Sequence, residues 1–514
     1  MKNNFLKIIK LPIPVNYFTF IFSYGLAMFL ICNSFNFTKF TPYFLANNQL
    51  DYLGLAVFFY LALALFILFM LLIFHKKTTK FFAILLCFLS SLVLYFMNKY
   101  DVLIDRTMIM NAIYTDKSEV HSLLSSQMVI YFLLGFILPS LLILKLKIIY
   151  PTKYFLKSLI IILLIIITSV AFGYSKFQTL HRAGNLSRKR IIYMVMPLNY
   201  IRSSFSALEK IYLKPIYKNK AKNIVVESSV SKTEDITVVL AIGETSRQKN
   251  FSLYGYERNT NPLLSKHKDL KILNGKARLG STLYALPEIL TKDDLPLPAV
   301  THFAKIPTSC YVNYSLYDNC VIPGEVKVEN CKYGKLCYDE DVIPYLKTEI
   351  EKPQNGAKLV VLHIGGGSHG PSYHERYPEE FQKFTPICKD ADVINKCSKE
   401  ELFNTFDNTI LYVDFVVDGI IKTLENSKKK YVFFYLSDHG ESLLEEGRIF
   451  HGTPPGIPLP DEQARIPLLV KSSIPIKIKN QNEYLQTQIF DTILYLLNVE
   501  TKIADKNLSF IEKL

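Results

Sequence analysis

Five long stretches in the first third of the chain contain almost no charged residues. About 20 apolar residues in a helix span the hydrocarbon core of a bilayer, so each stretch is a candidate transmembrane helix. Any one of them alone could be a buried core helix, but five in series favour a membrane domain. The expected spans are Pro14 to Phe35, Leu53 to Phe74, Phe81 to Met97, Met128 to Leu144 and Leu159 to Phe172.

Lysines in alternate connections predict the orientation of these helices. They gather before the first span, between the second and third, and between the fourth and fifth. Positive charge stays on the cytoplasmic side, so we expect a cytoplasmic N-terminus and a periplasmic remainder, in a bacterial inner membrane. The first span is too long for a cleavable signal and lacks a small-residue cleavage pattern.

The formal net charge of +14 does not indicate a nucleic-acid partner. Membrane topology accounts for many of the lysines, and no nucleic-acid-binding motif accompanies them. The remaining surplus is interpreted as affinity for anionic membrane surfaces, with a plain solvated basic surface as the alternative.

Beyond residue 235, short apolar runs alternate with helical patterns, which predicts an α/β domain with a mainly parallel sheet. The whole chain then divides into a transmembrane helical domain (1–173), a bridging amphipathic helix and linker (174–234), and a periplasmic catalytic domain (235–514). The expected strands are Ile236 to Ile242, Leu359 to His363, Tyr431 to Leu436 and Ile466 to Val470, and the expected helices lie near Glu400 to Glu425 and Thr487 to Leu497.

Cysteine usage agrees with an oxidising compartment. Cys32 and Cys87 fall in expected spans and are interpreted as apolar side chains, whereas the other six lie in the exported part. A zinc cluster of cysteines is less favoured, because no C-x-x-C pair occurs. Closeness in sequence suggests three pairs among the fifteen possible pairings: Cys310 with Cys320, Cys331 with Cys337, and Cys388 with Cys397.

Side chains suited to a metal follow the ends of the expected strands. Ligands gather beyond the carboxyl ends of strands in open α/β sheets. Glu244 follows the first strand, Asp438 and His439 follow a later one, and His369 and His451 lie in the segments GGGSHGP and FHGTPP. Singly, each could be a helix cap or a loop residue; together they offer oxygen and nitrogen donors suited to Zn²⁺.

Longer strings resemble the lipid A phosphoethanolamine transferase family, which shares the alkaline phosphatase and sulfatase fold. The resemblance extends over nearly the whole chain, including the five-helix anchor, and such strings are more specific than a lone short motif. They are GETSRQKNFSLYGYERNTNP, GSHGPSYHERYPEEFQKFTPIC, FNTFDNTILYVD, and SDHGESLLEEG followed by FHGTPP and DEQARIPLL.

The resemblance implies a nucleophile and a zinc site. Its pattern makes Thr282 the nucleophile, with Pro287 five residues later, and Ser281 is the competing hydroxyl. A helix beginning near Thr282 would help to hold phosphate oxygens. The implied zinc contacts are Glu244, Thr282, Asp438 and His439.

One family feature is missing around this helix. The family commonly brackets the nucleophile helix with a disulfide, but the corresponding positions here hold Arg278 and Glu288. The sequence therefore leaves open how the helix is held in place.

The resemblance also implies substrate contacts. His369 and His451 match residues that bind the phosphate or the leaving group, while His363 and His374 are assigned structural and loop positions. In YDVLIDRTMIMNAIYTDKSEV, Asn111 and Glu119 match positions that receive the phosphoethanolamine head group; a polar loop with a helix cap is the alternative. The implied donor is phosphatidylethanolamine and the implied acceptor is lipid A or a related lipooligosaccharide.

Other functions fit the pattern less well. A glycerophosphotransferase of the same superfamily is the closest alternative. Asn111, Glu119, the SHGPSY string and the cysteine pairs favour ethanolamine. A sulfatase lacks support because no Cys or Ser occurs in the C/S-x-P-x-R setting. An inactive sensor would not need every ligand, and a transporter would need ionisable residues within the spans.

Overall fold

The computed structural model describes most of the chain in two compact units. The described residues are 12–34, 37–46, 48–100, 102–114, 125–187, 190–209, 211, 227–312, 328–330, 338–365, 370–390 and 393–514. The first unit comprises residues 1–110 and 125–208, and the second comprises 111–124 and 209–514. The predicted three-part division at residues 173 and 234 stays a prediction.

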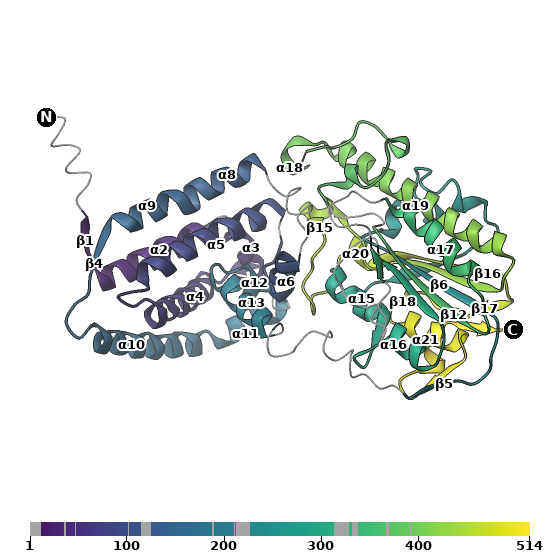
Figure 1. The fold of residues 1–514 in the computed structure, drawn as a ribbon. Coiled ribbons are helices and arrows are strands. Elements are labelled where there is room, and N and C mark those ends of the chain that lie inside the picture. Colours follow the sequence, from purple (N-terminus) through teal and green to yellow (C-terminus); the bar gives the residue numbers. More distant parts are fainter. Residues whose placement is uncertain are drawn as a thin grey trace. The chain divides into compact units, whose positions relative to one another are not determined.

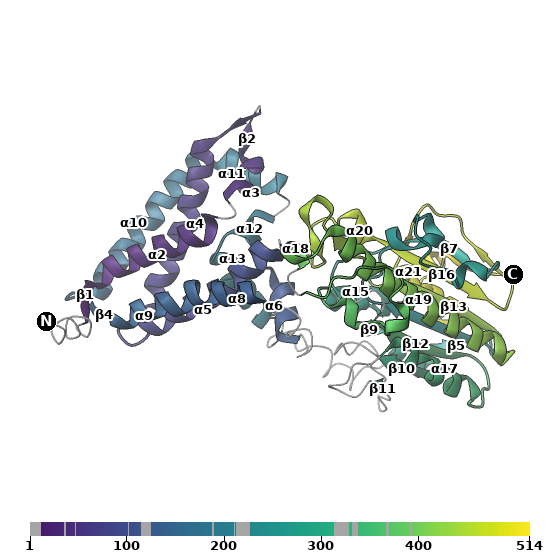
Figure 2. The ribbon, with the colours of Figure 1, turned by 90° about the horizontal axis from the view of Figure 1, so that it is seen from above.

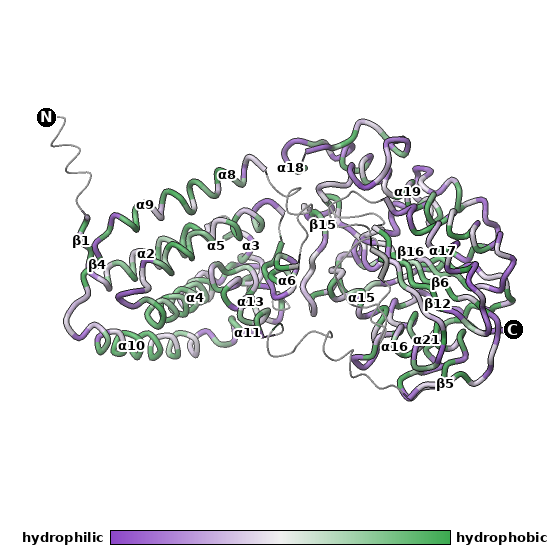
Figure 3. Tube along the Cα trace, viewed as in Figure 1, coloured by the Kyte–Doolittle hydropathy of each residue, from purple (hydrophilic) through white to green (hydrophobic). Residues whose placement is uncertain are grey.

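The first unit confirms the five predicted spans. Its long helices are apolar over most of their length and appear as long green segments in Figure 3. Helix α4 packs against both α2 and α10, and α5 lies beside α8 and α9 (Figure 2). The five spans are α2 (Tyr17–Ser34), α4 (Tyr52–Ile73), α5 (Thr79–Tyr100), the continuous segment Ser126–Lys145, and α10 (Tyr154–Ser175).

The fourth span contains a wider turn at its centre. It consists of α8 (Ser126–Phe132), the π-helical turn η2 (Leu133–Ile137) and α9 (Leu138–Lys145), with Pro139 at the start of α9. Proline has no backbone N–H and its ring crowds the carbonyl of the preceding turn, so the wider turn just before Pro139 relieves that crowding. The span continues as one helical segment.

The basic stretch after the fifth span folds into α11 (Phe177–Leu186), α12 (Arg190–Met194) and α13 (Leu198–Leu208). Buried polar side chains fix it to the spans. Asn33, near the end of α2, donates to the carbonyl of Met196 over 2.7 Å and accepts from the Met196 N–H over 3.0 Å. The hydroxyls of Ser90 on α5 and Tyr200 on α13 lie 2.9 Å apart. These bonds satisfy polar groups inside an apolar bundle, where an unpaired one is costly.

The second unit is built on an eight-stranded sheet. Its strand order is β11-β10-β12-β6-β13-β16-β7-β18. Helices α17 (Val342–Glu351) and α19 (Lys399–Ser427) cover one face, and α15 (Thr282–Leu290), α16 (Leu297–Phe303) and α21 (Gln488–Leu496) cover the other (Figure 1). The strands are β6 (Thr237–Gly243), β7 (Lys271–Lys276), β10 (Thr308–Val312), β11 (Val328–Asn330), β12 (Lys358–Ile364), β13 (Tyr431–Ser437), β16 (Arg465–Ser472) and β18 (Tyr484–Leu485).

The position of the central strands in the sheet explains why their sequences are apolar. Every residue of β6, β12 and β13 is buried, because helices cover both faces of the sheet. These three strands are parallel, with Ile242 of β6 opposite His363 of β12 and Leu436 of β13. Their carboxyl ends therefore lie at the same edge of the sheet, where Glu244 and Asp438 follow.

The prediction of a mainly parallel sheet is confirmed, with one strand reversed. β16 runs antiparallel to both of its neighbours, β13 and β7. A short apolar run gives no signal for strand direction, so the sequence could not distinguish this case.

One predicted disulfide is fully described. Cys388 and Cys397 are bonded, and this bond closes the segment just before α19. Cys310 is also disulfide-bonded, whereas Cys320, Cys331 and Cys337 lie outside the described residues. Cys32 and Cys87 are buried free thiols in spans, as predicted.

We expect the double substitution Cys388→Ala and Cys397→Ala to destabilise the second unit. A disulfide that joins residues nine apart lowers the conformational entropy of the unfolded chain, and this stabilises the fold by about 3 kcal/mol. Thermal unfolding of the full-length protein in detergent, followed by circular dichroism, should show a lower melting temperature for this unit. Equal melting temperatures of the oxidised wild type and the variant would contradict this.

Candidate active site

The turns after β6 and β13 bind one another through backbone and side-chain hydrogen bonds. The Asp438 N–H donates to the Gly243 carbonyl over 2.9 Å, and Asp438 Oδ1 accepts from the N–H of Thr245 over 3.0 Å. Thr245 adopts a φ of 51°, which turns the chain sharply after Glu244. This interlock holds the carboxylates of Glu244 and Asp438 at one edge of the sheet.

Thr282 lies at the first position of α15, as predicted, and its hydroxyl reaches both strand-end turns. The hydroxyl donates to Glu244 Oε1 over 2.8 Å and lies 3.4 Å from His439 Nε2. Ser281 precedes the helix at its N-cap position, with no side-chain capping bond. Thr282 is therefore the hydroxyl that contacts the strand-end side chains Glu244 and His439.

The protonation of His439 follows from its partners. Its Nδ1 lies 3.0 Å from the carbonyl oxygen of Gly440, which can only accept, so Nδ1 bears the hydrogen. Burial lowers the pKa of His439 to about 4, against the opposing effect of Asp438, so the ring is neutral. Nε2 consequently presents a lone pair.

Several electron pairs converge around this nitrogen. His439 Nε2 lies 3.3 Å from Asp438 Oδ2 and 3.6 Å from Glu244 Oε1, and all three residues are fully buried. Asp438 Oδ2 has no hydrogen-bond donor within the described part of the chain. Buried lone pairs that face one another repel unless a cation or a proton lies between them. The donors fit Zn²⁺, which accepts imidazole nitrogen and carboxylate oxygen.

His451 adds a second imidazole beside this cluster. It follows β15 (Ile449–Phe450), and its ring centroid lies 4.5 Å from that of His439. One ligand atom from each of Glu244, His439 and His451 lies within 4.8 Å of the others, a spacing that could hold a metal ion. The structure thus brings together Glu244, Thr282, Asp438, His439 and His451.

The remaining predicted residues are only partly described. Asn111 on α6 (Arg106–Tyr114) falls in the second unit, and its Nδ2 donates to Ser281 Oγ over 3.3 Å. Glu119 and His369 lie outside the described residues. His363, for which we predict only a structural role, lies on β12, and its Nε2 is 3.9 Å from Glu244 Oε2.

Glu441 is a site residue that the sequence analysis did not assign. Its Oε2 lies 2.9 Å from His451 Nδ1, and the carboxylate is fully buried. Burial raises the pKa of Glu441, while His451 opposes that rise. Its place two residues after His439 in SDHGES was the available signal.

The turn after Asp438 and His439 has no room for a side chain at position 440, where the residue is glycine. A Cβ atom at this position would lie 2.1 Å from the Glu462 carbonyl oxygen and 3.1 Å from the Arg247 Cβ. The Gly440 N–H also donates to the Gln463 carbonyl over 2.8 Å. Glycine therefore allows the close approach that positions His439.

The positions at which the family commonly has a disulfide hold an ion pair here. Arg278 Nη1 lies 3.5 Å from Glu288 Oε2, which joins the segment before α15 to the helix itself. More than half of the Arg278 side chain is exposed, so the pair contributes at most about 1 kcal/mol. It replaces a covalent link with a weak, salt-sensitive one.

Comparisons with known proteins agree with this arrangement. Residues 299–499 match the Sulfatase family, and residues 61–212 match the family described as "Phosphoethanolamine transferase EptA/EptB". Fold and site together define a membrane-anchored enzyme of the alkaline phosphatase and sulfatase superfamily.

Related proteins extend the comparison to most of the chain. A "Phosphoethanolamine transferase EptA" of Escherichia coli K12 is 33% identical, covering 79% of this chain and 80% of its own length. A protein of the same description from Helicobacter pylori is 30% identical, covering 90% and 89%. The chain belongs to the phosphoethanolamine transferase family.

A solved structure supports the same family over the full length. The "Integral membrane protein lipooligosaccharide phosphoethanolamine transferase A (EptA) from Neisseria meningitidis" superposes with a TM-score of 0.82 at 25% identity. The match covers 97% of this chain and 99% of that one. The pairing of a five-helix membrane unit with a sulfatase-type unit is therefore shared.

We expect that swapping the two charges of the Arg278–Glu288 pair is tolerated better than reversing the charge of Arg278 alone. Arg278→Glu places two carboxylates together and should lower the melting temperature of the second unit and its transferase activity modestly, with larger effects at low salt. Arg278→Glu combined with Glu288→Arg should restore both. Equal behaviour of the single and double variants would show that the pair does not support the helix.

Proposed function

We propose that this protein transfers phosphoethanolamine from phosphatidylethanolamine to lipid A or a related lipooligosaccharide, through a phosphoethanolamine-threonine intermediate on Thr282. The hydrogen bond from the Thr282 hydroxyl to Glu244 is the observation that most directly supports this role. The names of the relatives support the group that is transferred and the class of acceptor.

The first half-reaction is a displacement at phosphorus. The Thr282 oxygen forms a bond to phosphorus, the bond from phosphorus to the diacylglycerol oxygen breaks, and that oxygen leaves with a proton. Thr282 directs its own proton toward Glu244, and the N-terminus of α15 offers backbone N–H groups to the phosphoryl oxygens. We assign His451, whose Nδ1 lies 2.9 Å from Glu441 Oε2, to donate the proton that the leaving oxygen takes up.

The second half-reaction restores the threonine. A phosphate or hydroxyl oxygen of the acceptor attacks the same phosphorus, and the Thr282 oxygen leaves and recovers a proton. The product contains an added ammonium, so the outer surface becomes less negative. Weaker attraction for cationic antimicrobial peptides follows from that change.

Zinc is the metal that we assign to this site, with Glu244, Thr282, Asp438 and His439 as its contacts. A bound Zn²⁺ would lower the pKa of a neighbouring hydroxyl and neutralise phosphoryl charge. The buried Asp438 Oδ2, with no hydrogen-bond donor among the described residues, supports a cation here.

Orientation and head-group contacts complete the proposal. The lysine distribution supports a cytoplasmic N-terminus and a periplasmic catalytic unit in the bacterial inner membrane. Asn111, Glu119 and His369 are assigned to the donor's head group and phosphate; Asn111 lies within hydrogen-bonding distance of Ser281, next to the nucleophile.

Intact-protein mass spectrometry tests the intermediate. Wild-type protein incubated with phosphatidylethanolamine and no acceptor should gain the mass of one phosphoethanolamine on Thr282, and Thr282→Ala should gain none. Ser281→Ala is the matched control and should keep the adduct. An adduct that persists in Thr282→Ala but disappears in Ser281→Ala would assign the nucleophile to Ser281.

Metal content tests the zinc site independently of turnover. Glu244→Ala and Asp438→Ala should each lose most of the bound zinc, measured by elemental mass spectrometry, because each removes a donor from a buried site. Glu445→Ala, which removes a half-buried carboxylate bound to Arg247, should keep the zinc. Full zinc content in both site variants would refute the ligand assignment.

A further inference from the structure

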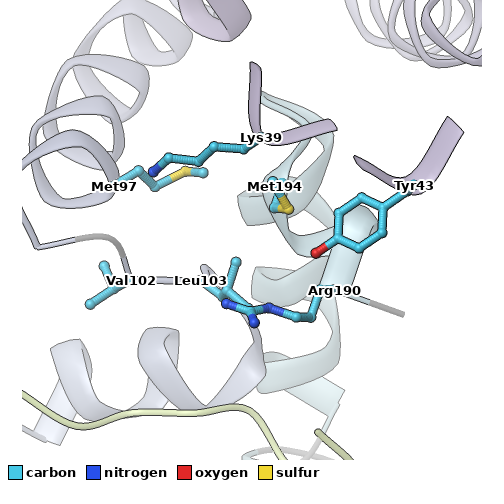
Figure 4. A pocket seen from close by; sticks show the side chains of 7 residues that line it. All are labelled: Lys39, Tyr43, Met97, Val102, Leu103, Arg190 and Met194. Atoms are coloured by element: carbon cyan, nitrogen blue, oxygen red, sulfur yellow. The ribbon is translucent and has the colours of Figure 1, made fainter. Parts of the chain in front are cut away.

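The membrane unit contains a cationic cavity that shares no lining residue with the candidate active site. Its volume is about 240 Å³, and all of its lining residues belong to the first unit. Lys39 and Arg190 reach into the same space, with the Tyr43 hydroxyl directed toward it (Figure 4). The lining residues are Lys39, Tyr43, Met97, Val102, Leu103, Arg190 and Met194.

Arg190 is the residue that needs a partner. It begins α12, and its guanidinium has neither an ion pair nor a hydrogen bond to any residue that the structure describes. Its Nε is buried and has no acceptor among the described residues. A buried charged donor without an acceptor is more costly than a neutral one, so the site favours an anion.

The remaining lining suits the apolar part of an amphiphile. Met97 and Met194 are almost fully buried, and Val102 and Leu103 extend the apolar wall. Methionine side chains adapt to irregular shapes. A cavity of this size has room for a head group, with any acyl chains left in the bilayer.

Hydrogen bonds connect the segments that form the walls of the cavity. Asn199 on α13 donates to the Sδ of Met97 over 3.2 Å and to the Tyr193 carbonyl over 3.1 Å. Ser203 donates to the Ile104 carbonyl over 2.9 Å, which fixes the segment that follows α5. The hydrogen bonds between the Asn33 side-chain amide and the Met196 backbone hold the same helices to the end of α2. The cavity is thus a preformed feature of the fold.

Its place along the chain puts it at a membrane surface. Lys39 follows the first span, and Val102 follows the third, so both lie where odd-numbered spans end. The fifth span ends on that same side, and the chain there continues into α11 and toward the second unit. A head group in this cavity would thus belong to the leaflet at which the odd-numbered spans end.

We propose that this cavity binds the phosphate of an anionic lipid head group, as a site separate from the Thr282 centre. Arg190 supplies a planar fork that matches phosphate oxygens, Lys39 adds a second positive charge, and Tyr43 can donate from its hydroxyl. The inference does not require the transfer reaction, because binding can be measured without turnover.

The test measures lipid binding by full-length protein in detergent. The probes are short-chain phosphatidic acid, short-chain phosphatidylcholine and inorganic phosphate, and the Thr282→Ala background prevents turnover. Phosphatidic acid should bind, and Arg190→Gln should weaken that binding about tenfold or more. Lys39→Gln should also weaken it, and Arg190→Lys should retain part of it.

Arg202→Gln is the matched control. Arg202 lies on α13 with its guanidinium 5.7 Å from the Tyr193 ring and does not line the cavity, so its loss should leave binding unchanged. Weak binding of inorganic phosphate alone identifies a lipid as the occupant, whereas equal binding identifies a free phosphate as the source. Unchanged affinity in both Arg190→Gln and Lys39→Gln, or equal binding of phosphatidylcholine, would overturn the proposal. If Arg190→Gln does not fold, the affinity of Lys39→Gln for phosphatidic acid tests the proposal.

Discussion

The close approach of buried lone pairs, which needs a positive charge between them, is the interaction around which the catalytic unit is arranged. Glu244, Asp438 and neutral His439 direct oxygen and nitrogen lone pairs toward one another in a fully buried position. Such an arrangement is unfavourable without a positive charge between the groups. The strand ends, the interlocked turns and the glycine at position 440 hold these groups in place despite that cost. Strain of this kind is typical of a site built for a metal and a reacting phosphate.

Much of this arrangement was predictable from the sequence, for physical reasons. Strands buried on both faces are continuous apolar runs, so β6, β12 and β13 were visible, and the residues after them meet at one edge of the sheet. The five spans were visible because a bilayer requires about 20 apolar residues for each crossing. Thr282 was different: only the family resemblance indicated it, because a hydroxyl at a helix start is also an ordinary cap.

The features that the sequence did not predict depend on contacts between distant segments. The reversed direction of β16 follows from its pairing with β13 and β7, which no local pattern records. Glu441 contacts His451, ten residues away, and this contact appears only once β14 (Ser442–Leu443) and β15 pair. The Arg278–Glu288 contact likewise shows how one chain replaces a covalent staple with an ion pair. The buried Arg190 Nε, which has no acceptor in the described part of the chain, likewise appears only in the folded structure.

Reconstitution with labelled lipid tests the central claim most directly. Zinc-loaded protein in liposomes that contain lipid A and phosphatidylethanolamine labelled in its ethanolamine should be followed by mass spectrometry of both lipids. The account predicts labelled phosphoethanolamine on lipid A and an equal amount of diacylglycerol, and neither product with Thr282→Ala. Transfer of glycerophosphate from added phosphatidylglycerol, with no labelled lipid A, would contradict it.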